Sequence, residues 1–126
     1  MESRKEIVVA KKRSGQYNCA QSVACSYCDL CGLSEEQMAG VAAAFGSGMG
    51  NMEGTCGSLV GAGIVLGSVK KDRMVARAQM KEIMEKFQER NGATRCKLLK
   101  GIGTGKLLRD CNDCVADAAE FLEEYL

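Results

Sequence analysis

The chain has 126 residues, a net charge of +1, eight cysteines, and neither histidine nor proline. Its length suits a single domain over residues 1–126 that buries an ordinary core, and its near-zero net charge argues against a general binder of nucleic acid. The absence of histidine excludes Ser–His and Cys–His catalytic pairs within the chain, and haem ligation by histidine.

The first third of the chain predicts three helices. The segment Glu2–Arg13 is charged around a short apolar centre, which favours a helix, although its β-branched residues also allow an edge strand. A second helix is expected over Tyr17–Cys31, with Gly32 as its stop. Ser34 and Gln37 form a capping box that opens the third helix.

The next stretch, Phe45–Gly67, holds eight of the fifteen glycines. Glycine allows positive φ and close backbone approach, but it costs conformational entropy on folding, so we expect this concentration to serve a site. A buried helix is expected from about Cys56 to Val69, because that segment is apolar all round. Gly57 and Gly61 lie on one face of it, where another backbone or a second copy in a homodimer could approach closely.

The remaining elements are also helical. A basic helix is expected over Lys71–Arg90, and Thr94 can cap a short helix that carries Cys96. Three glycines between residues 101 and 105 form a second flexible loop, and a last amphipathic helix starts near Asp110. The sequence therefore predicts an all-α fold, a compact bundle of five to six helices with glycine-rich loops.

Neither a secretory signal nor a membrane span is expected. The first apolar run, Ile7 to Ala10, is too short for a signal peptide, and no segment offers the roughly 20 apolar residues of a transmembrane helix. We therefore expect a cytoplasmic protein with no membrane insertion. In a reducing compartment, eight cysteines indicate metal binding or redox chemistry more than structural disulfides.

A nucleotide-binding loop is the first motif to consider. Gly103-Thr104-Gly105-Lys106 is similar to the end of a phosphate-binding loop, but Lys100 and Leu107 stand where that motif needs a glycine and a Ser or Thr. The run also follows a helix rather than a strand. We interpret it as a flexible loop.

The run Cys25-x-x-Cys28-x-x-Cys31 is typical of the start of a ferredoxin ligand set. On one α-helix Cys25 and Cys31 would lie about 120° apart and could not ligate one ion. We therefore expect Cys28 and Cys31 to be small core residues. The pair Cys111-x-x-Cys114 leaves three alternatives open: a redox pair, half of a zinc site, or one ligand plus a core residue.

Four cysteines stand at or near predicted helix starts: Cys19, Cys56, Cys96 and Cys111. A helix N-terminus has a partial positive charge and free N–H groups, which stabilise a thiolate and lower the pKa of cysteine. The thiolate is the form that attacks disulfides and binds metals. If the helices pack with these ends together, the four thiols form one site.

Five segments of the sequence resemble a known protein family. They are YNCAQSV (17–23), AFGSGMG (44–50), CGSLVGA (56–62), CKLLKG (96–101) and CNDCVADAAE (111–120). The chain resembles the C_GCAxxG_C_C family of redox-active proteins over about residues 17–126. The resemblance implies redox activity and a functional link to a transporter, and it specifies no substrate or redox partner.

By position, the family cysteines correspond to Cys19, Cys56, Cys96 and Cys111. The family element Cys-Gly-Ala-x-x-Gly corresponds to residues 56–61, with Ser58 in place of the usual alanine, which we interpret as a minor change. The other cysteines fall outside the family set; they are Cys25, Cys28, Cys31 and Cys114.

Three functions remain open. The sequence also leaves open whether the protein is an enzyme or an electron carrier. In the first, a thiolate, for which we favour Cys56, exchanges with a disulfide formed by the other family cysteines. In the second, the same four cysteines ligate an iron–sulfur cluster or zinc, and backbone N–H groups of glycines such as Gly54, Gly57 and Gly61 point at the sulfurs. In the third, a helical interaction domain uses its cysteines only to fill the core.

Overall fold

The computed structural model describes residues 1–126 and consists of seven α-helices without a β-strand. The helices are α1 (Lys5–Arg13), α2 (Cys19–Ser26), α3 (Glu35–Ala42), α4 (Gly57–Lys70), α5 (Arg73–Asn91), α6 (Cys96–Lys100) and α7 (Cys111–Glu123). Short turns at Cys28–Cys31, Ala43–Phe45 and Gly48–Met52 complete the chain. The all-α prediction is confirmed, while the number of helices exceeds the five to six expected.

Polar side chains fix where the helices begin. Asn18 accepts a hydrogen bond from the backbone of Gln21, whose side chain bonds back to Asn18, so α2 opens with a capping box. The capping box predicted at Ser34 and Gln37 is present at the start of α3. Asp110 caps α7 by accepting from the backbone N–H of Asp113. These caps satisfy backbone donors that the first turn leaves free.

The helix predicted over Tyr17–Cys31 is confirmed as far as Ser26 and is wrong beyond it. Helix α2 ends at Ser26, and Cys28–Cys31 forms a 3₁₀ turn instead. The guanidinium of Arg4 donates to the backbone carbonyl of Ser26 at 2.9 Å and forms an ion pair with Asp29. The Arg4 side chain therefore occupies the carbonyl oxygen of Ser26, which a longer α2 would need for its own backbone hydrogen bond. Arg4 thereby holds the turn in position.

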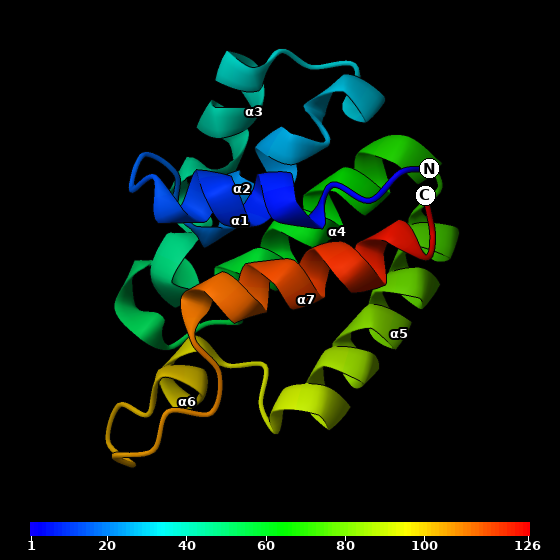
Figure 1. Ribbon diagram of the computed structural model, residues 1–126. Helices are drawn as coiled ribbons and strands as arrows, with labels where there is room; N and C mark the ends of the chain where they lie inside the picture. Colours follow the sequence, from blue (N-terminus) through cyan, green and yellow to red (C-terminus); the bar gives the residue numbers. More distant parts are fainter.

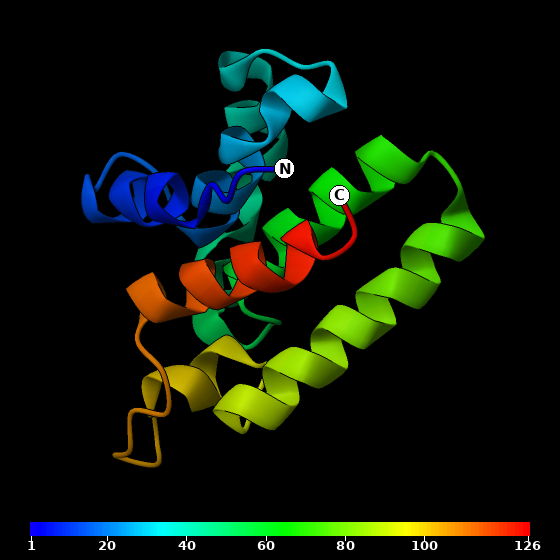
Figure 2. The same ribbon diagram turned by 45° about the vertical axis from the view of Figure 1, so that its right-hand side comes forward.

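Helix α4 lies at the centre of the molecule. It packs against α2, α5 and α7, and Figures 1 and 2 show α5 running along one side of it and α7 along another. Two glycines allow close contacts of α4: a Cβ at Gly61 would lie 2.6 Å from the carbonyl oxygen of Ala20 in α2, and one at Gly57 would lie 2.7 Å from the carbonyl oxygen of Phe45 and 3.3 Å from the backbone nitrogen of Ala20. A side chain at either position would push the helices apart.

The two termini lie on the same side of the molecule (Figures 1 and 2). There α1 is held against α7 by polar contacts: the backbone N–H of Arg4 donates to Glu123 at 2.8 Å, and Lys5 pairs with Glu120 at 2.9 Å. The buried ring of Tyr27 donates its hydroxyl to the same Glu123 carboxylate. No helix is both long enough and apolar enough to cross a membrane.

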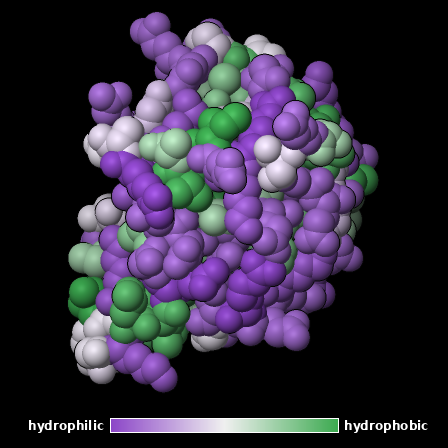
Figure 3. Space-filling view, in the orientation of Figure 1, coloured by the Kyte–Doolittle hydropathy of each residue, from purple (hydrophilic) through white to green (hydrophobic).

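The face of the molecule seen in Figure 3 is mostly hydrophilic. Hydrophobic side chains gather at its lower left, over the region that Figure 1 assigns to α6 and the loop that follows it. Leu98, Ile102 and Leu107 are exposed large hydrophobic residues in this region, together with Leu108. This apolar surface lies next to the site described below, because Lys100 and Arg109 at the two ends of the loop line that site.

Candidate functional site

Five cysteines line one small cavity at the meeting point of four helix N-termini. They are Cys19, Cys56, Cys96, Cys111 and Cys114. Ser47, Gly57, Leu99, Lys100 and Arg109 complete the lining. The cavity measures about 10 Å³, close to the smallest volume that holds one water. The four cysteines predicted at helix starts are therefore brought together, and a fifth joins them.

Each predicted cysteine occupies the position expected for it along the chain. Cys19, Cys96 and Cys111 are the first residues of α2, α6 and α7, and Cys56 is the N-cap of α4. Cys111 is half-buried, whereas the other cysteines of the cavity are buried. The sulfur atoms therefore lie where backbone N–H groups and the helix dipole favour a negative charge.

A short backbone pairing places Cys56 beside Cys96. The N–H of Cys56 donates to the carbonyl oxygen of Thr94 at 2.8 Å, and the N–H of Cys96 donates to that of Gly54 at 3.0 Å. Arg95 in this pairing forms an ion pair with Glu53. These contacts join the chain before α4 to the chain before α6, so two cysteines that are far apart in sequence share one site.

The glycine-rich loop wraps around Cys96. Gly48 has a positive φ of 55°, and a Cβ there would lie 2.5 Å from the Cβ of Cys96 and 2.9 Å from the carbonyl oxygen of Gly54. The N–H of Gly54 in turn donates to the carbonyl oxygen of Gly48 at 3.0 Å. The loop glycines therefore allow backbone segments to pack closely around Cys96. Gly57 and Gly61 have the same effect where α4 packs against α2. A cofactor-binding role for Gly54, Gly57 and Gly61 stays a prediction.

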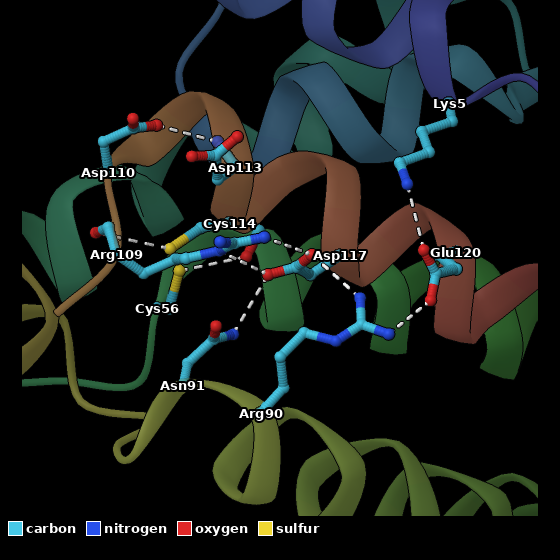
Figure 4. Close-up of polar contacts among 11 residues, drawn as sticks. Lys5, Cys56, Arg90, Asn91, Arg109, Asp110, Asp113, Cys114, Asp117 and Glu120 are labelled. Carbon is cyan, nitrogen blue, oxygen red and sulfur yellow. Dashed lines mark hydrogen bonds and ion pairs between the residues drawn. The ribbon is translucent and has the colours of Figure 1, made fainter.

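The first pair of thiols is formed by Cys56 and Cys114, whose sulfur atoms lie side by side in Figure 4. The hydrogen bond from the Cys114 thiol lowers the pKa of Cys56 to about 7 against the opposing effect of burial. The buried Ser58 hydroxyl lies 3.0 Å from the Cys56 sulfur and acts in the same direction. The same hydrogen bond, together with burial, raises the pKa of Cys114. Within this pair Cys56 is therefore the cysteine that ionises more readily, and Cys114 keeps its proton.

The second pair is formed by Cys111 and Cys19. The hydrogen bond from the Cys19 thiol lowers the pKa of Cys111 to about 6, and the ammonium groups of Lys100 and Lys12 act in the same direction. The pKa of Cys19 is raised by the same hydrogen bond and by burial. The pair therefore repeats the arrangement of Cys56 and Cys114, with positive charges beside its thiolate.

Cys96 differs from the paired cysteines because burial raises its pKa. Lys100 lies near both Cys96 and Cys111. Burial acts to lower the pKa of the Lys100 ammonium group, but the negative charges of the nearby thiolates together have the larger effect, so the pKa of Lys100 is raised. The site thus combines two cysteines with lowered pKa values, three cysteines with raised pKa values, and a lysine that stays charged.

A buried carboxylate anchors Arg109 at the edge of the cavity. The side chain of Asp117, which is 2% exposed, accepts hydrogen bonds from Arg109, Arg90 and Asn91 at 3.0 to 3.1 Å. Figure 4 shows these three donors converging on Asp117, with Cys114 on the adjacent turn of α7. The sulfur of Cys114 lies 3.8 Å from the carbonyl oxygen of Arg109. The network fixes the start of α7 and with it Cys111 and Cys114.

The cysteines do not form a ready set of metal ligands. No group of three cysteine, aspartate or glutamate side chains lies close enough to hold one metal ion, and the cavity is too small for an iron–sulfur cluster. Three of the four predicted ligands, Cys19, Cys56 and Cys111, lie in the two cysteine pairs instead, and Cys96 belongs to neither pair.

Three residues of the site were not assigned to it from the sequence, although a role for Cys114 was left open. Cys114 stands one turn after Cys111, so the spacing i, i+3 on a helix already pointed to a shared face. Ser58 was interpreted as a minor change, yet its hydroxyl contacts Cys56. Lys100 carried no recognisable signal, because its position depends on how α6 packs. The remaining cysteines, Cys25, Cys28 and Cys31, lie outside the cavity.

Comparison with known proteins gives one result. Residues 17–125 match the family described as "Putative redox-active protein (C_GCAxxG_C_C)". No match was found among curated proteins or solved structures. The matched region includes α2 through α7 and therefore every cysteine of the cavity.

Proposed function

The chain belongs to the C_GCAxxG_C_C family of redox-active proteins, and we propose that its cavity cysteines carry out thiol–disulfide exchange. The observation that carries this proposal is that five cysteines line one cavity, where Cys56 and Cys111, whose pKa values are lowered, lie beside Cys114 and Cys19, whose pKa values are raised. Exchange needs a thiolate to attack a disulfide and a second thiol to resolve the mixed disulfide. Both pairs supply these two groups.

Cys111 is the attacking thiolate in this proposal. It is the half-buried cysteine of the cavity, whereas Cys56, which the sequence favoured, is 5% exposed. The Cys111 thiolate attacks one sulfur of a disulfide R–S–S–R, forms a mixed disulfide and releases RS⁻. Cys19 then loses its proton and attacks Cys111, which closes a Cys19–Cys111 disulfide and releases the second RS⁻. Two electrons pass to the substrate, which becomes two thiols.

The second pair extends the capacity of the site. Cys56 and Cys114 lie in the same cavity and can reduce the Cys19–Cys111 disulfide by the same exchange, so that their own disulfide forms. Lys100 stabilises the thiolate of Cys111 throughout. The two pairs together store four electrons, two for each disulfide.

The reaction of the reduced protein with an aromatic disulfide tests this function. Dithiobis(nitrobenzoate) releases one coloured thiolate for each attack. The Cys19–Cys111 pair of wild type should release two equivalents in a fast phase, as Cys19 resolves the adduct on Cys111. Cys111→Ser should slow the release from this pair by about tenfold or more, because a thiol at its ordinary pKa is only a few per cent ionised at pH 7. Cys19→Ser should release one equivalent from this pair and retain the adduct on Cys111.

Cys25→Ser is the matched control, since Cys25 is buried outside the cavity and its pKa is raised to about 11 by burial. It should leave the fast phase unchanged. Adducts are located by mass spectrometry. A fast phase that survives in Cys111→Ser would remove Cys111 from its role, and a native protein whose thiols react only after unfolding would favour the interaction-domain alternative.

The metal alternative is tested on anaerobically purified protein by elemental analysis and a visible spectrum. Stoichiometric zinc or iron, lost in Cys56→Ser and Cys111→Ser alike, would contradict the exchange proposal. It would also require the side chains to leave their present pairs. Metal-free, colourless protein that shows the fast phase would support the exchange reaction.

A further inference from the structure

A second pair of cysteines lies outside the cavity, on the 3₁₀ turn Cys28–Cys31. Such a turn has 3.0 residues per turn, so the side chains of its first and last residues lie one above the other. Three steps of about 2.0 Å each separate their Cα atoms by about 6 Å. Disulfides form across Cα separations of about 4.4–6.8 Å. The Cα separation of Cys28 and Cys31 therefore lies within the range that a disulfide spans, and a small movement of the turn would bring their Cβ atoms together.

The surroundings of the two thiols are also alike. Both are half-buried and pack against the core, while Asp29 and Leu30 between them are less covered. The thiol of Cys31 lies near the hydroxyl of Ser68 toward the end of α4, and that hydroxyl donates to the carbonyl oxygen of Ile64. Neither cysteine is fully buried, so a small disulfide can approach the turn.

The turn is held rigidly from outside. Arg4, at the start of α1, makes two hydrogen bonds to the carboxylate of Asp29, at 2.6 and 3.0 Å, and a third to the carbonyl oxygen of Ser26 at 2.9 Å. At the far end, Gly32 adopts a positive φ of 70° that stops the turn. The two cysteines are held close together before any reaction occurs, so closing a disulfide costs little further ordering.

This pair is remote from the cavity. Cys56 is the N-cap residue of α4. Ser68, which lies near Cys31, is close to the other end of the same helix. An α-helix rises about 1.5 Å per residue, so the length of α4 between these two positions is roughly 18 Å. Direct exchange between the two sets of thiols is therefore excluded, and the turn must react with a disulfide from solution.

We propose that Cys28 and Cys31 form a second redox-active dithiol, which is oxidised by low-molecular-weight disulfides independently of the cavity. One of the two thiols loses its proton and attacks a disulfide R–S–S–R, which gives a mixed disulfide and RS⁻. The other thiol then loses its proton and attacks the first, which closes the Cys28–Cys31 bond and releases the second RS⁻. The protein loses two electrons and two protons, and the small disulfide becomes two thiols.

Asp29, which lies between the two cysteines, allows a direct test. Reduced protein is equilibrated with mixtures of reduced and oxidised glutathione, acid-quenched, alkylated, and cleaved before aspartate. Cleavage at Asp29 separates the two cysteines onto different fragments unless a disulfide joins them. In oxidising mixtures we expect joined fragments from wild type, and separate fragments from Cys28→Ser and Cys31→Ser, with glutathione on the remaining cysteine.

Two controls separate this site from its neighbours. Cys25→Ser removes the closest other thiol of the run and should keep the joined fragments. Cys111→Ser disables the proposed cavity reaction and should keep them too, so that failure of one proposal is distinguishable from failure of the other. Fragments that stay separate and doubly alkylated in wild type, under conditions that oxidise the cavity thiols, would overturn the inference. A bond from Cys31 to Cys25, or loss of the joined fragments in Cys111→Ser, would overturn it as well.

Discussion

At the scale of single residues, Ser58 is a neighbour of Cys56 that acts directly on its sulfur. Ser58 is fully buried and its hydroxyl lies 3.0 Å from the Cys56 sulfur. A hydroxyl that donates to a thiolate favours the charged form. Ser58 therefore helps to keep Cys56 ionised in a buried place where the thiolate would otherwise be costly.

We predict that Ser58→Ala raises the pKa of Cys56 and slows its alkylation at pH 7 several-fold, because the thiolate fraction falls. The measurement is the pH dependence of iodoacetamide labelling of Cys56, read by mass spectrometry. Ser68→Ala is the matched control: it removes a hydroxyl from the same helix, at a distance from Cys56. Equal labelling rates in Ser58→Ala and wild type would show that the hydroxyl does not stabilise the thiolate.

At the scale of elements, the packing of α2 on α4 positions Cys19 and Cys56 relative to each other. Gly61 makes this packing close, since its missing Cβ would stand 2.6 Å from the carbonyl oxygen of Ala20. Backbone atoms cannot move aside as the end of a flexible side chain can. A methyl group there must separate the two helices.

We predict that Gly61→Ala lowers the free energy of unfolding by about 1–3 kcal/mol, the usual cost of overpacking. Gly67→Ala on the same helix is the control, because nothing lies within 4 Å of its added Cβ; it should be neutral or stabilising by up to about 1 kcal/mol. Urea unfolding followed by circular dichroism measures both. A Gly61→Ala midpoint at or above that of Gly67→Ala would contradict the packing argument.

Local signals made the helix starts predictable. The caps at Asn18 and Asp110 depend on residues three positions away, so the sequence indicated where α2 and α7 begin, and with them the positions of Cys19 and Cys111. The 3₁₀ turn at Cys28–Cys31 was not predictable in this way. Its cause is Arg4, a side chain that precedes α1 and is distant from the turn in sequence.

The sequence predicted which cysteines make up the candidate site better than it predicted how they are paired. Four of its five cysteines could be assigned from their helix starts, but the pairing of Cys56 with Cys114 depends on the rotation of α7 about its axis. That rotation is set by contacts such as those of Asp117 with Arg90 and Asn91, which join α7 to the end of α5. No local pattern contains this information.

At the scale of the whole molecule, the two thiolates couple folding to pH. The pKa values of Cys56 and Cys111 are lowered to about 7 and about 6 in the folded protein, from an ordinary value of 9.0. Between these values and pH 9 the unfolded chain binds more protons than the folded one, so stability rises with pH. Above pH 9 the folded protein binds more protons than the unfolded chain, because the raised pKa values of Cys19 and Cys114 keep these thiols protonated. Stability therefore falls with pH in that range.

We therefore predict that the fully reduced protein becomes more stable from pH 6 to a maximum near pH 9 and less stable beyond it, with each thiolate contributing a slope of at most about 1.4 kcal/mol per pH unit. Urea unfolding in a non-thiol reductant, repeated across this range, measures the slope. Cys56→Ser and Cys111→Ser should each flatten the rise. Cys25→Ser should leave it intact, since the pKa of Cys25 is raised to about 11 and it stays protonated throughout the rise. A wild-type stability that is flat or falls from pH 6 to pH 8.5 would mean that the buried sulfurs carry no stabilised charge, and the proposed exchange chemistry would lose its nucleophiles.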